Sequence, residues 1–336
     1  MNAQPQLLWT DWQAQQRAAR ISTADLLAEV GLGAADFPAG VLAEPEFAVL
    51  APPHFRSLIR RGDPRDPLLL QVLARGEEAV PQPGRLTDPL EEADYRAAPG
   101  LLRKYRSRAL LIASGACAIH CRYCFRRHYD YGDAVLTRAG EAEALAAIAA
   151  DAAIDEVILS GGDPLSLTDG RLAALVTAIA AIGHVTTLRL HSRTLMTIPD
   201  RVTPGLIDLL AGTRLRVVIV VHSNHAGEIS GDVAAALGQL RGVGVTLLNQ
   251  SVLLAGVNDD AAIIAAHARR LFAAGVLPYY MHLTDPVDGA AHFDVDEGRA
   301  REIEAALRGM LPGYLVPRFV REVPGRDSKT PLAALS

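Results

Sequence analysis

The sequence predicts an α/β protein in which a partial, six-stranded, TIM-like (β/α) barrel follows an N-terminal helical extension. From about residue 101 onward, short runs rich in Leu and β-branched residues alternate with Ala-rich stretches of helical spacing, which is typical of βαβ units and a parallel sheet. Polar residues that can take part in chemistry follow almost every one of these runs. Active-site residues occupy that position in parallel barrels.

The N-terminal part of the chain is expected to be helical. Apolar residues recur with helical spacing over Trp12–Arg20, Thr23–Val30 and Pro53–Arg60, and Ser22 or Thr23 can cap the second helix. The stretch from Val80 to Gly100 is rich in Pro, Gly and acidic residues, and we interpret it as an irregular connector. The expected organisation is therefore a helical region with its connector (1–100), a barrel (101–320) and a C-terminal segment (321–336).

Six strands are expected in the barrel, at Ala109–Ala113, Glu156–Leu159, Thr186–Leu190, Leu215–Val221, Val243–Leu248 and Leu277–Met281. The helical stretches between them include Ala139–Ala150, Leu172–Ala181, Asp232–Gly242 and Asp260–Ala274. Six strands suit an open or incomplete barrel better than a closed eight-stranded one.

A polar cluster follows each expected strand. In chain order these are the cysteines, Ser160-Gly161-Gly162-Asp163, His191-Ser192-Arg193, His222-Ser223-Asn224-His225, Asn249-Gln250, and His282 with Asp285. Because the carboxyl ends of parallel strands converge on one mouth, we expect an active site there.

Composition excludes several classes of protein. The 336 residues are 50% hydrophobic and 21% charged, which is a globular balance, and the net charge of −5 leaves no basic footprint for nucleic acid or an anionic membrane. The N-terminus has no basic segment followed by an apolar run, and no apolar stretch is long enough to span a bilayer. We therefore expect a cytoplasmic protein.

The three cysteines of the chain lie together in a C-x3-C-x2-C motif formed by Cys117, Cys121 and Cys124. A disulfide-stabilised secreted protein would spread an even number along its length, so the cluster indicates a metal site. Three thiolates on a [4Fe–4S] cluster leave one iron open to a small molecule. The alternative is a zinc site completed by His120 or His128 in a binding protein without catalysis.

The cysteine motif after the first strand resembles that of the radical S-adenosylmethionine (SAM) superfamily, in which the open iron binds the methionine part of SAM. Gly161-Gly162-Asp163 after the second strand resembles the methionine-binding element of that superfamily. This resemblance implies a radical-SAM barrel, in which the glycines let the protein backbone approach the methionine part of SAM closely and Asp163 accepts from its ammonium.

Further blocks are similar to the lysine 2,3-aminomutase family: CRYCFRR, SGGDPL, HSRTLMTIPDRVTP, HSNHAGEI, NQSVLLAGVND, PYYMHLTDPVDGAAHF and VPRFVREVPGRDSKTPL. They cover roughly residues 100 to 332. The short form of the chain, with LLRKYRSRALL and RYCFRRHYDY, resembles the branch that makes (R)-β-lysine for attachment to elongation factor P. Alternatives are an aminomutase for another amino acid such as glutamate, and an enzyme that releases free β-lysine.

The resemblance implies a role for individual residues. Lys329 aligns with the lysine that binds pyridoxal phosphate, although Arg326-Asp327-Ser328 replaces the family's glycine run before it. Arg126 aligns with the arginine that binds the substrate carboxylate, and Asp285 with a carboxylate that meets the lysine substrate. Glu322 stands where free lysine aminomutases carry Asp, and Lys104 replaces an arginine that contacts the cofactor phosphate. His222 and Gln250 match positions that line the adenosyl side.

The implied reaction is the 2,3-migration of an amino group on L-lysine, started by a 5′-deoxyadenosyl radical from SAM and assisted by pyridoxal phosphate. It requires an external one-electron reductant. The implied partners are elongation factor P and its β-lysine ligase. Two acids suited to a diamine, Asp285 and Glu322, argue against a substrate with a side-chain carboxylate, because like charges repel.

Overall fold

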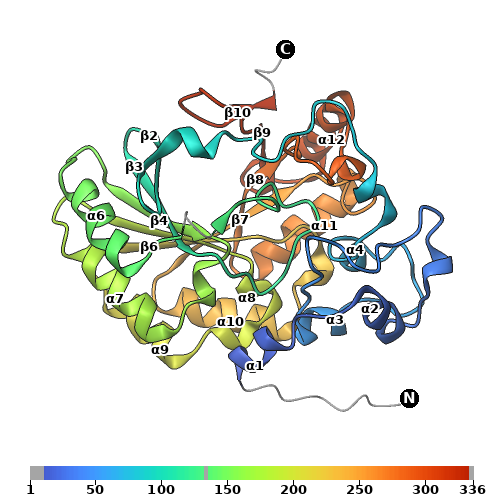
Figure 1. Cartoon of the computed structure of the whole chain (residues 1–336), viewed down its shortest axis with the longest axis horizontal. Coiled ribbons are helices and arrows are strands. Elements are labelled where there is room, and N and C mark those ends of the chain that lie inside the picture. Colours follow the sequence, from blue (N-terminus) through green and yellow to red (C-terminus); the bar gives the residue numbers. More distant parts are fainter. Residues whose placement is uncertain (1–10, 132–134, 333–336) are drawn as a thin grey trace.

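One curved β-sheet, in which the strands follow one another in chain order, forms the centre of the protein (Figure 1). The computed structural model describes residues 11–131 and 135–332. Within them β3 to β9 run parallel, while β1, β2 and β10 are antiparallel to their neighbours. The strands are β1 (Arg96–Ala98), β2 (Leu101–Tyr105), β3 (Arg108–Ser114), β4 (Glu156–Gly161), β5 (Thr187–Ser192), β6 (Arg216–Val221), β7 (Thr246–Val252), β8 (Leu277–His282), β9 (Arg318–Arg321) and β10 (Thr330–Pro331).

The partial barrel expected from the sequence is confirmed, because this strand order leaves the sheet open between β1 and β10. The six expected strands correspond to β3 through β8, with ends that differ by a few residues. The sequence prediction missed the four edge strands. In β2 and β9, charged residues stand beside few apolar ones, and β10 has only two residues. The sequences of these three strands therefore show no clear strand pattern.

Helices cover the outer side of the sheet (Figure 1). They are α6 (Arg138–Ala149), α7 (Asp169–Ala180), α9 (Pro204–Gly212), α10 (Gly231–Gly242), α11 (Ala261–Ala273) and α12 (Glu297–Met310), with the short α8 (Thr194–Thr197) after β5. Each of the six long helices begins after a Thr, Ser or Asp whose side chain accepts a backbone N–H of the first turn. No helix in the described part of the chain has both the length and the apolar character to cross a lipid bilayer.

The strands separate an apolar outer layer from a polar inner face. Leu111, Leu159, Leu190 and Ile219 sit side by side on four neighbouring parallel strands, and all four are fully buried against the outer helices. Burial of each such side chain stabilises the fold by about 1.5–3 kcal/mol. Since side chains alternate along a strand, the flanking residues point inward, and Ser160 is one of them. The core therefore leaves the inner face free for polar residues.

The N-terminal extension packs beneath the cysteine loop that follows β3. It contains α1 (Trp12–Arg17), α2 (Thr23–Glu29), α3 (Pro53–Ser57) and α4 (Pro67–Leu70), and Ser22 caps α2 as expected. Its apolar cluster, which includes Phe55 and Leu69, also contains Ile119 from the cysteine loop. The extension is thus part of the support of that loop.

The expectation of an unpacked connector at residues 80–100 is partly wrong. Leu86 forms a β-bridge with Val287, and the last residues form a 3-10 turn (Glu92–Tyr95) and β1. The prolines and glycines of this segment indicate an irregular loop. Its packing contacts could not be predicted from the sequence, because the partners lie far away in the chain. The connector reaches the inner face of the sheet, where Glu92 and Tyr95 line the main cavity.

A buried group of charges fastens the extension to the cysteine loop. Glu78 accepts hydrogen bonds from Arg122 at 2.8 Å (Nε to Oε1) and from Arg127 at 2.6 Å (Nη2 to Oε2). The side chains of Glu78 and Arg122 are essentially inaccessible to solvent. Arg122 also lies over the ring of Phe47. Because both arginines depend on one carboxylate, its loss would leave two buried charges without their anion.

We therefore expect Glu78→Gln to lower the free energy of unfolding by about 3–5 kcal/mol, the usual effect of breaking a buried ion pair from one side. Urea denaturation of the variant and the parent measures this. The matched control is Glu302→Gln, which removes an exposed pair with Arg299 and should change stability by less than about 1 kcal/mol. Equal effects in the two variants would contradict the supporting role of Glu78.

Candidate functional site

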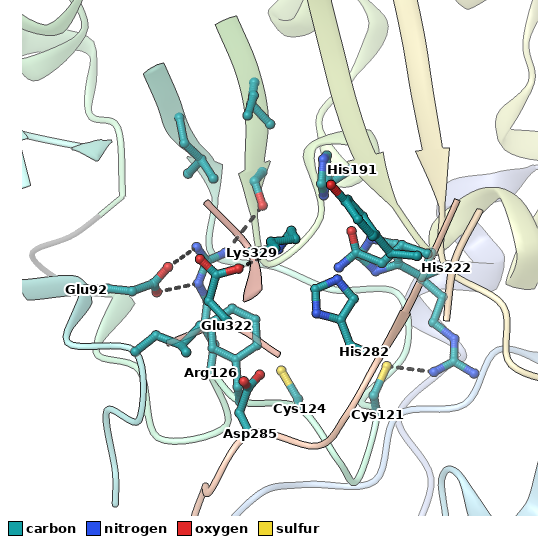
Figure 2. A pocket seen from close by; sticks show the side chains of 18 of the residues that line it. Glu92, Cys121, Cys124, Arg126, His191, His222, His282, Asp285, Glu322 and Lys329 are labelled. Atoms are coloured by element: carbon teal, nitrogen blue, oxygen red, sulfur yellow. Dashed lines mark hydrogen bonds and ion pairs between the residues drawn. The ribbon is translucent and has the colours of Figure 1, made fainter. Parts of the chain in front are cut away.

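A cavity of about 880 Å³ lies on the inner face of the sheet. All site residues expected from the sequence line it: Lys104, Cys117, Cys121, Cys124, Arg126, Gly161, Gly162, Asp163, His222, Gln250, Asp285, Glu322 and Lys329. Figure 2 shows that the labelled side chains among them converge on a common space. The structure brings the expected residues together, while the chemical role of each stays a prediction.

The three thiols lie in the loop that follows β3, and all three are partly accessible from the cavity. Burial raises the pKa of Cys117, and it raises the pKa of Cys124 to about 12. The thiols of Cys117 and Cys124 are therefore protonated in the free protein, and binding of iron would displace their protons. The guanidinium of Arg193 donates to Cys121 Sγ at 2.8 Å, so a buried cation faces this thiol.

The zinc alternative gains no support from the side chains around this loop. His120 stacks on Phe47 with ring centroids 4.2 Å apart, and its Nδ1 lies 2.7 Å from the carbonyl oxygen of Ala48. His128 Nε2 lies 3.2 Å from the carbonyl oxygen of Asp288. Over residues 11–131 and 135–332, no group of three His, Cys, Asp or Glu side chains is arranged to hold a single metal ion.

Two glycines let the end of β4 run directly against the cysteine loop. Gly161 has φ +123°, and a Cβ there would lie 2.2 Å from the carbonyl oxygen of Ser114. A Cβ at Gly162 would lie 2.5 Å from the carbonyl oxygen of Ala116. Both contacts are shorter than any side chain tolerates, so only glycine allows this approach of the two backbones.

The carboxylate of Asp163 joins the turns after β4 and β5. Its Oδ1 accepts from the N–H of Leu165 at 2.9 Å, and its Oδ2 accepts from the N–H groups of Arg193 and Thr194 at 2.8 and 2.9 Å. Ser192 Oγ adds a bond of 3.0 Å to the same oxygen. In the free protein this carboxylate thus binds backbone, and its expected contact with the SAM ammonium stays a prediction.

Three histidines, which lie on β5, directly after β6 and on β8, line the cavity with their Nε2 atoms covered and without a hydrogen-bond partner among the described residues: His191, His222 and His282. Burial lowers the pKa of each, and for His222 it lowers the pKa to about 4. The nearby cations Lys329 and Arg126 act in the same direction. The rings are therefore neutral at physiological pH and able to bond a polar ligand.

Glu322, directly after β9, forms ion pairs with two lysines of the cavity. Lys329 Nζ lies 2.6 Å from Oε2, while Lys104 Nζ and Tyr105 Oη donate to Oε1 at 2.8 and 2.6 Å. Although burial opposes ionisation, Lys329 and Lys104 together lower the pKa of Glu322 to about 2. The ion pair directs the amine of Lys329 into the cavity rather than into solvent (Figure 2).

Arg126 is paired within the protein. Its Nε and Nη2 donate to the two carboxylate oxygens of Glu92, each at 2.6 Å, and its Nη1 donates to Gly161 O at 2.9 Å and Ser160 Oγ at 3.3 Å (Figure 2). The arginine is 7% exposed. A fork-to-fork geometry of this kind is a strong charge-assisted pair.

Asp285 differs from these paired groups. Its Oδ1 is covered and has no hydrogen-bond partner among the described residues. Burial raises the pKa of Asp285 to about 7, against the opposing effect of Lys329. The carboxyl is therefore close to half ionised near neutral pH, and a cation that enters the cavity would complete its ionisation.

Sequence analysis missed Glu92 and Tyr105 as site residues, and it did not assign Arg193 to the thiols. Tyr105 neighbours Lys104 on a strand that was not expected, and Glu92 lies in the connector. Arg193 belongs to the polar cluster after β5, so its position near the site was expected. For Arg193, no signal in the sequence indicated that its guanidinium contacts the thiol of Cys121.

Comparisons with known proteins agree with this site. The sequence profile of the Radical SAM superfamily matches residues 111–265. L-lysine 2,3-aminomutase of Escherichia coli (strain K12) is 45% identical over 323 residues, which cover 96% of this chain and 94% of the relative. The enzymes of the same name from Haemophilus influenzae and Buchnera aphidicola are 46% and 42% identical, covering 91% and 84% of this chain and 90% and 83% of the relatives.

The raised pKa of Asp285 predicts how stability depends on pH. Between the ordinary value of 3.8 and about 7, the unfolded chain ionises this group while the folded protein retains the proton. Its contribution is therefore present at low pH and is lost as pH rises toward 7. We therefore compare the free energy of unfolding of Asp285→Asn with that of the parent. The difference between the two should shift by about 2 kcal/mol in favour of the variant when the pH is raised from 5.5 to 8. Urea denaturation at both pH values measures this, and a constant difference would contradict the raised pKa.

Proposed function

The chain belongs to the L-lysine 2,3-aminomutase family of radical SAM enzymes, and we propose from this premise that it converts L-lysine to (R)-β-lysine. The observation that carries the proposal is that one cavity holds the three thiols, the amine of Lys329, and charged groups of both signs. An α-amino acid with a second amino group presents charges that match this set.

Enzymes of this family use a [4Fe–4S] cluster, SAM and pyridoxal phosphate. The residues present fit these groups. Cys117, Cys121 and Cys124 would hold the cluster, and the close approach at Gly161 and Gly162 offers backbone to SAM. When bound, the cluster supplies the electron that cleaves SAM to a 5′-deoxyadenosyl radical, and pyridoxal phosphate carries the migrating amino group.

Lys329 is the proposed attachment point of pyridoxal phosphate, and Glu322 positions its amine. The ion pair at 2.6 Å fixes the amine in the cavity, where the long side chain would otherwise sample many rotamers. Lys104, the second cation on Glu322, is the proposed partner of the cofactor phosphate. Phosphate binding would take this cation from Glu322, and Tyr105 would still hold Oε1.

Arg126 and Asp285 are the proposed ligands of the substrate. A guanidinium can bind the α-carboxylate through two parallel hydrogen bonds, and the unpartnered Oδ1 of Asp285 suits an ammonium group. Glu322 is the proposed second acid for the amino groups. A glutamate substrate would place its side-chain carboxylate among these two acids, where like charges repel, so lysine fits better.

The neutral histidines of the inner face support radical chemistry in the same space. His191, His222 and His282 offer their Nε2 atoms to ligands without carrying charge. His222 and Gln250 are the proposed contacts on the adenosyl side, and Asp163 remains the proposed partner of the methionine ammonium. Burial of these groups in a cavity that ligands fill would exclude water from the reactive intermediate.

We further propose that the β-lysine serves the modification of elongation factor P through its β-lysine ligase, and that the enzyme acts in the cytoplasm with an external one-electron reductant. The resemblance of the RYCFRRHYDY and LLRKYRSRALL segments to that branch of the family supports this fate. Deletion of the coding gene should then leave elongation factor P without β-lysine, as mass spectrometry of the purified factor would show. An unchanged mass would instead favour release of free β-lysine.

The central experiment is an anaerobic assay of the reconstituted protein with reductant, SAM, pyridoxal phosphate and L-lysine. We expect β-lysine to form, and L-glutamate to give no β-glutamate under the same conditions. Formation of β-glutamate without β-lysine would overturn the substrate assignment.

The two cofactor sites should be separable by mutation. We expect Lys329→Ala to lose the pyridoxyl label after borohydride reduction yet retain the iron–sulfur absorbance, because residue 329 lies on a different segment from the cysteines. Cys121→Ala should show the reverse, since each thiolate is one of three anchors. Peptide mapping of the label in the parent is the control. A label on Lys104 would contradict the assignment of Lys329.

A further inference from the structure

Arg126, the proposed ligand of the substrate carboxylate, has no free pair of donors in the structure. Glu92 occupies Nε and Nη2, and the oxygens of Gly161 and Ser160 occupy Nη1. Phe125 and Tyr129 lie beside the guanidinium, with ring centroids 5.0 and 5.7 Å from Cζ. A second carboxylate therefore cannot bind Arg126 bidentately while Glu92 stays in place.

Glu92 reaches Arg126 from a turn at the surface, which is held mainly by hydrogen bonds from the N–H groups of Glu92 and Ala93 to the Asp88 carboxylate. The 3-10 turn Glu92–Tyr95 contains no buried residue, and the exposed Ala93 and Asp94 follow Glu92. The preceding Glu91 has φ +52°, a left-handed conformation that is unfavourable for a residue with a side chain. Few buried contacts oppose movement of such a segment. The carboxylate itself is the best-covered part, because the Glu92 side chain is only 12% exposed.

The same turn contacts the segment that carries Lys329. Tyr95 Oη accepts the backbone N–H of Gly325 at 2.8 Å, and the Tyr95 ring lies 5.3 Å from Lys104 Nζ. A shift of the turn would thus change contacts on both sides of the cavity, at Arg126 and at the loop before Lys329. The turn therefore contacts both Arg126, through Glu92, and the loop before Lys329, through Tyr95.

We propose that Glu92 is a stand-in for the substrate: it neutralises Arg126 in the free enzyme and yields this place to the α-carboxylate of the incoming amino acid. The proposal rests on the proposed function, because it takes Arg126 as the carboxylate ligand. Glu92 makes the same two bonds that a substrate carboxylate would make. Two carboxylates on one buried guanidinium would repel each other, so the exchange is one for one, and the displaced Glu92 moves outward with its turn into water.

Displacement of an internal ligand weakens substrate binding, since part of the binding free energy is used to break the internal pair. Its removal should therefore tighten the binding of ligands that carry an α-carboxylate, and only of those. A residue that merely supports Arg126 would behave in the opposite way, because its loss would misplace the guanidinium and weaken binding. The direction of the change thus distinguishes the two roles.

The test measures equilibrium binding to the full-length protein loaded with cluster and pyridoxal phosphate, without SAM or reductant, through the change in pyridoxal absorbance. The ligands are L-lysine and cadaverine, which is lysine without its carboxylate. We expect Glu92→Gln to lower the Kd for L-lysine about tenfold, the usual effect of one charge-assisted contact, and to leave the Kd for cadaverine unchanged. Asp94→Asn removes an exposed charge from the same turn and should change neither Kd.

Arg126→Gln separates the inference from the proposed function. If this variant raises the Kd for L-lysine but not for cadaverine, Arg126 binds the carboxylate. An unchanged or raised Kd for L-lysine in Glu92→Gln would then overturn the stand-in role alone. If Arg126→Gln leaves the Kd for L-lysine unchanged, the carboxylate assignment and the inference both fail. Should Glu92→Gln not fold, Glu92→Asp carries the same test, with a smaller but selective gain for L-lysine.

Discussion

The carboxylate of Glu322 joins side chains from the two edges of the open sheet. It lies directly after β9, while Lys104 and Tyr105, which both donate to it, lie on β2 at the opposite edge. Backbone hydrogen bonds do not join β1 to β10 in the described residues, and Figure 1 shows the two edges facing one another across the mouth. An ion pair thus closes a barrel that the backbone leaves open, and it does so where Lys329 also needs a partner.

The alternation of side chains along the strands makes this arrangement possible. One set of residues, such as Leu159 and Leu190, packs against the helices and supplies the dry core. The other set faces a cavity in which an unpaired charge is costly, and four cations there have an anion: Arg126 pairs with Glu92, Arg193 with Glu228, and the two lysines with Glu322. Oδ1 of Asp285 has no such partner among the described residues, and burial raises the pKa of this carboxyl.

Sequence analysis could predict the six parallel strands β3 to β8 and the polar clusters at their ends, because both depend on local periodicity. It could not predict that Glu92 binds Arg126 or that Glu78 binds Arg122, since a charge in a turn looks the same whether it faces water or a buried guanidinium. For a related reason, the strands near the two edges of the sheet were not predicted. Arg318–Arg321 has two charges in four residues, and its pairing with β8 and β10 comes from the path of the chain.

The charges of the free site form a pattern of their own. Arg126 is bound by the carboxylate of one residue of the chain, and Glu322 is bound by the amine of another, so the cavity holds both a carboxylate and a lysine ammonium before any ligand enters. In the proposed reaction, Lys329 would hold pyridoxal phosphate, and an amino group of the substrate would take a place near Glu322. The substrate carboxylate likewise takes the place of Glu92. A site organised in this way would keep Arg126 and Glu322 paired before and after the ligands enter, and it favours a substrate that carries both charges.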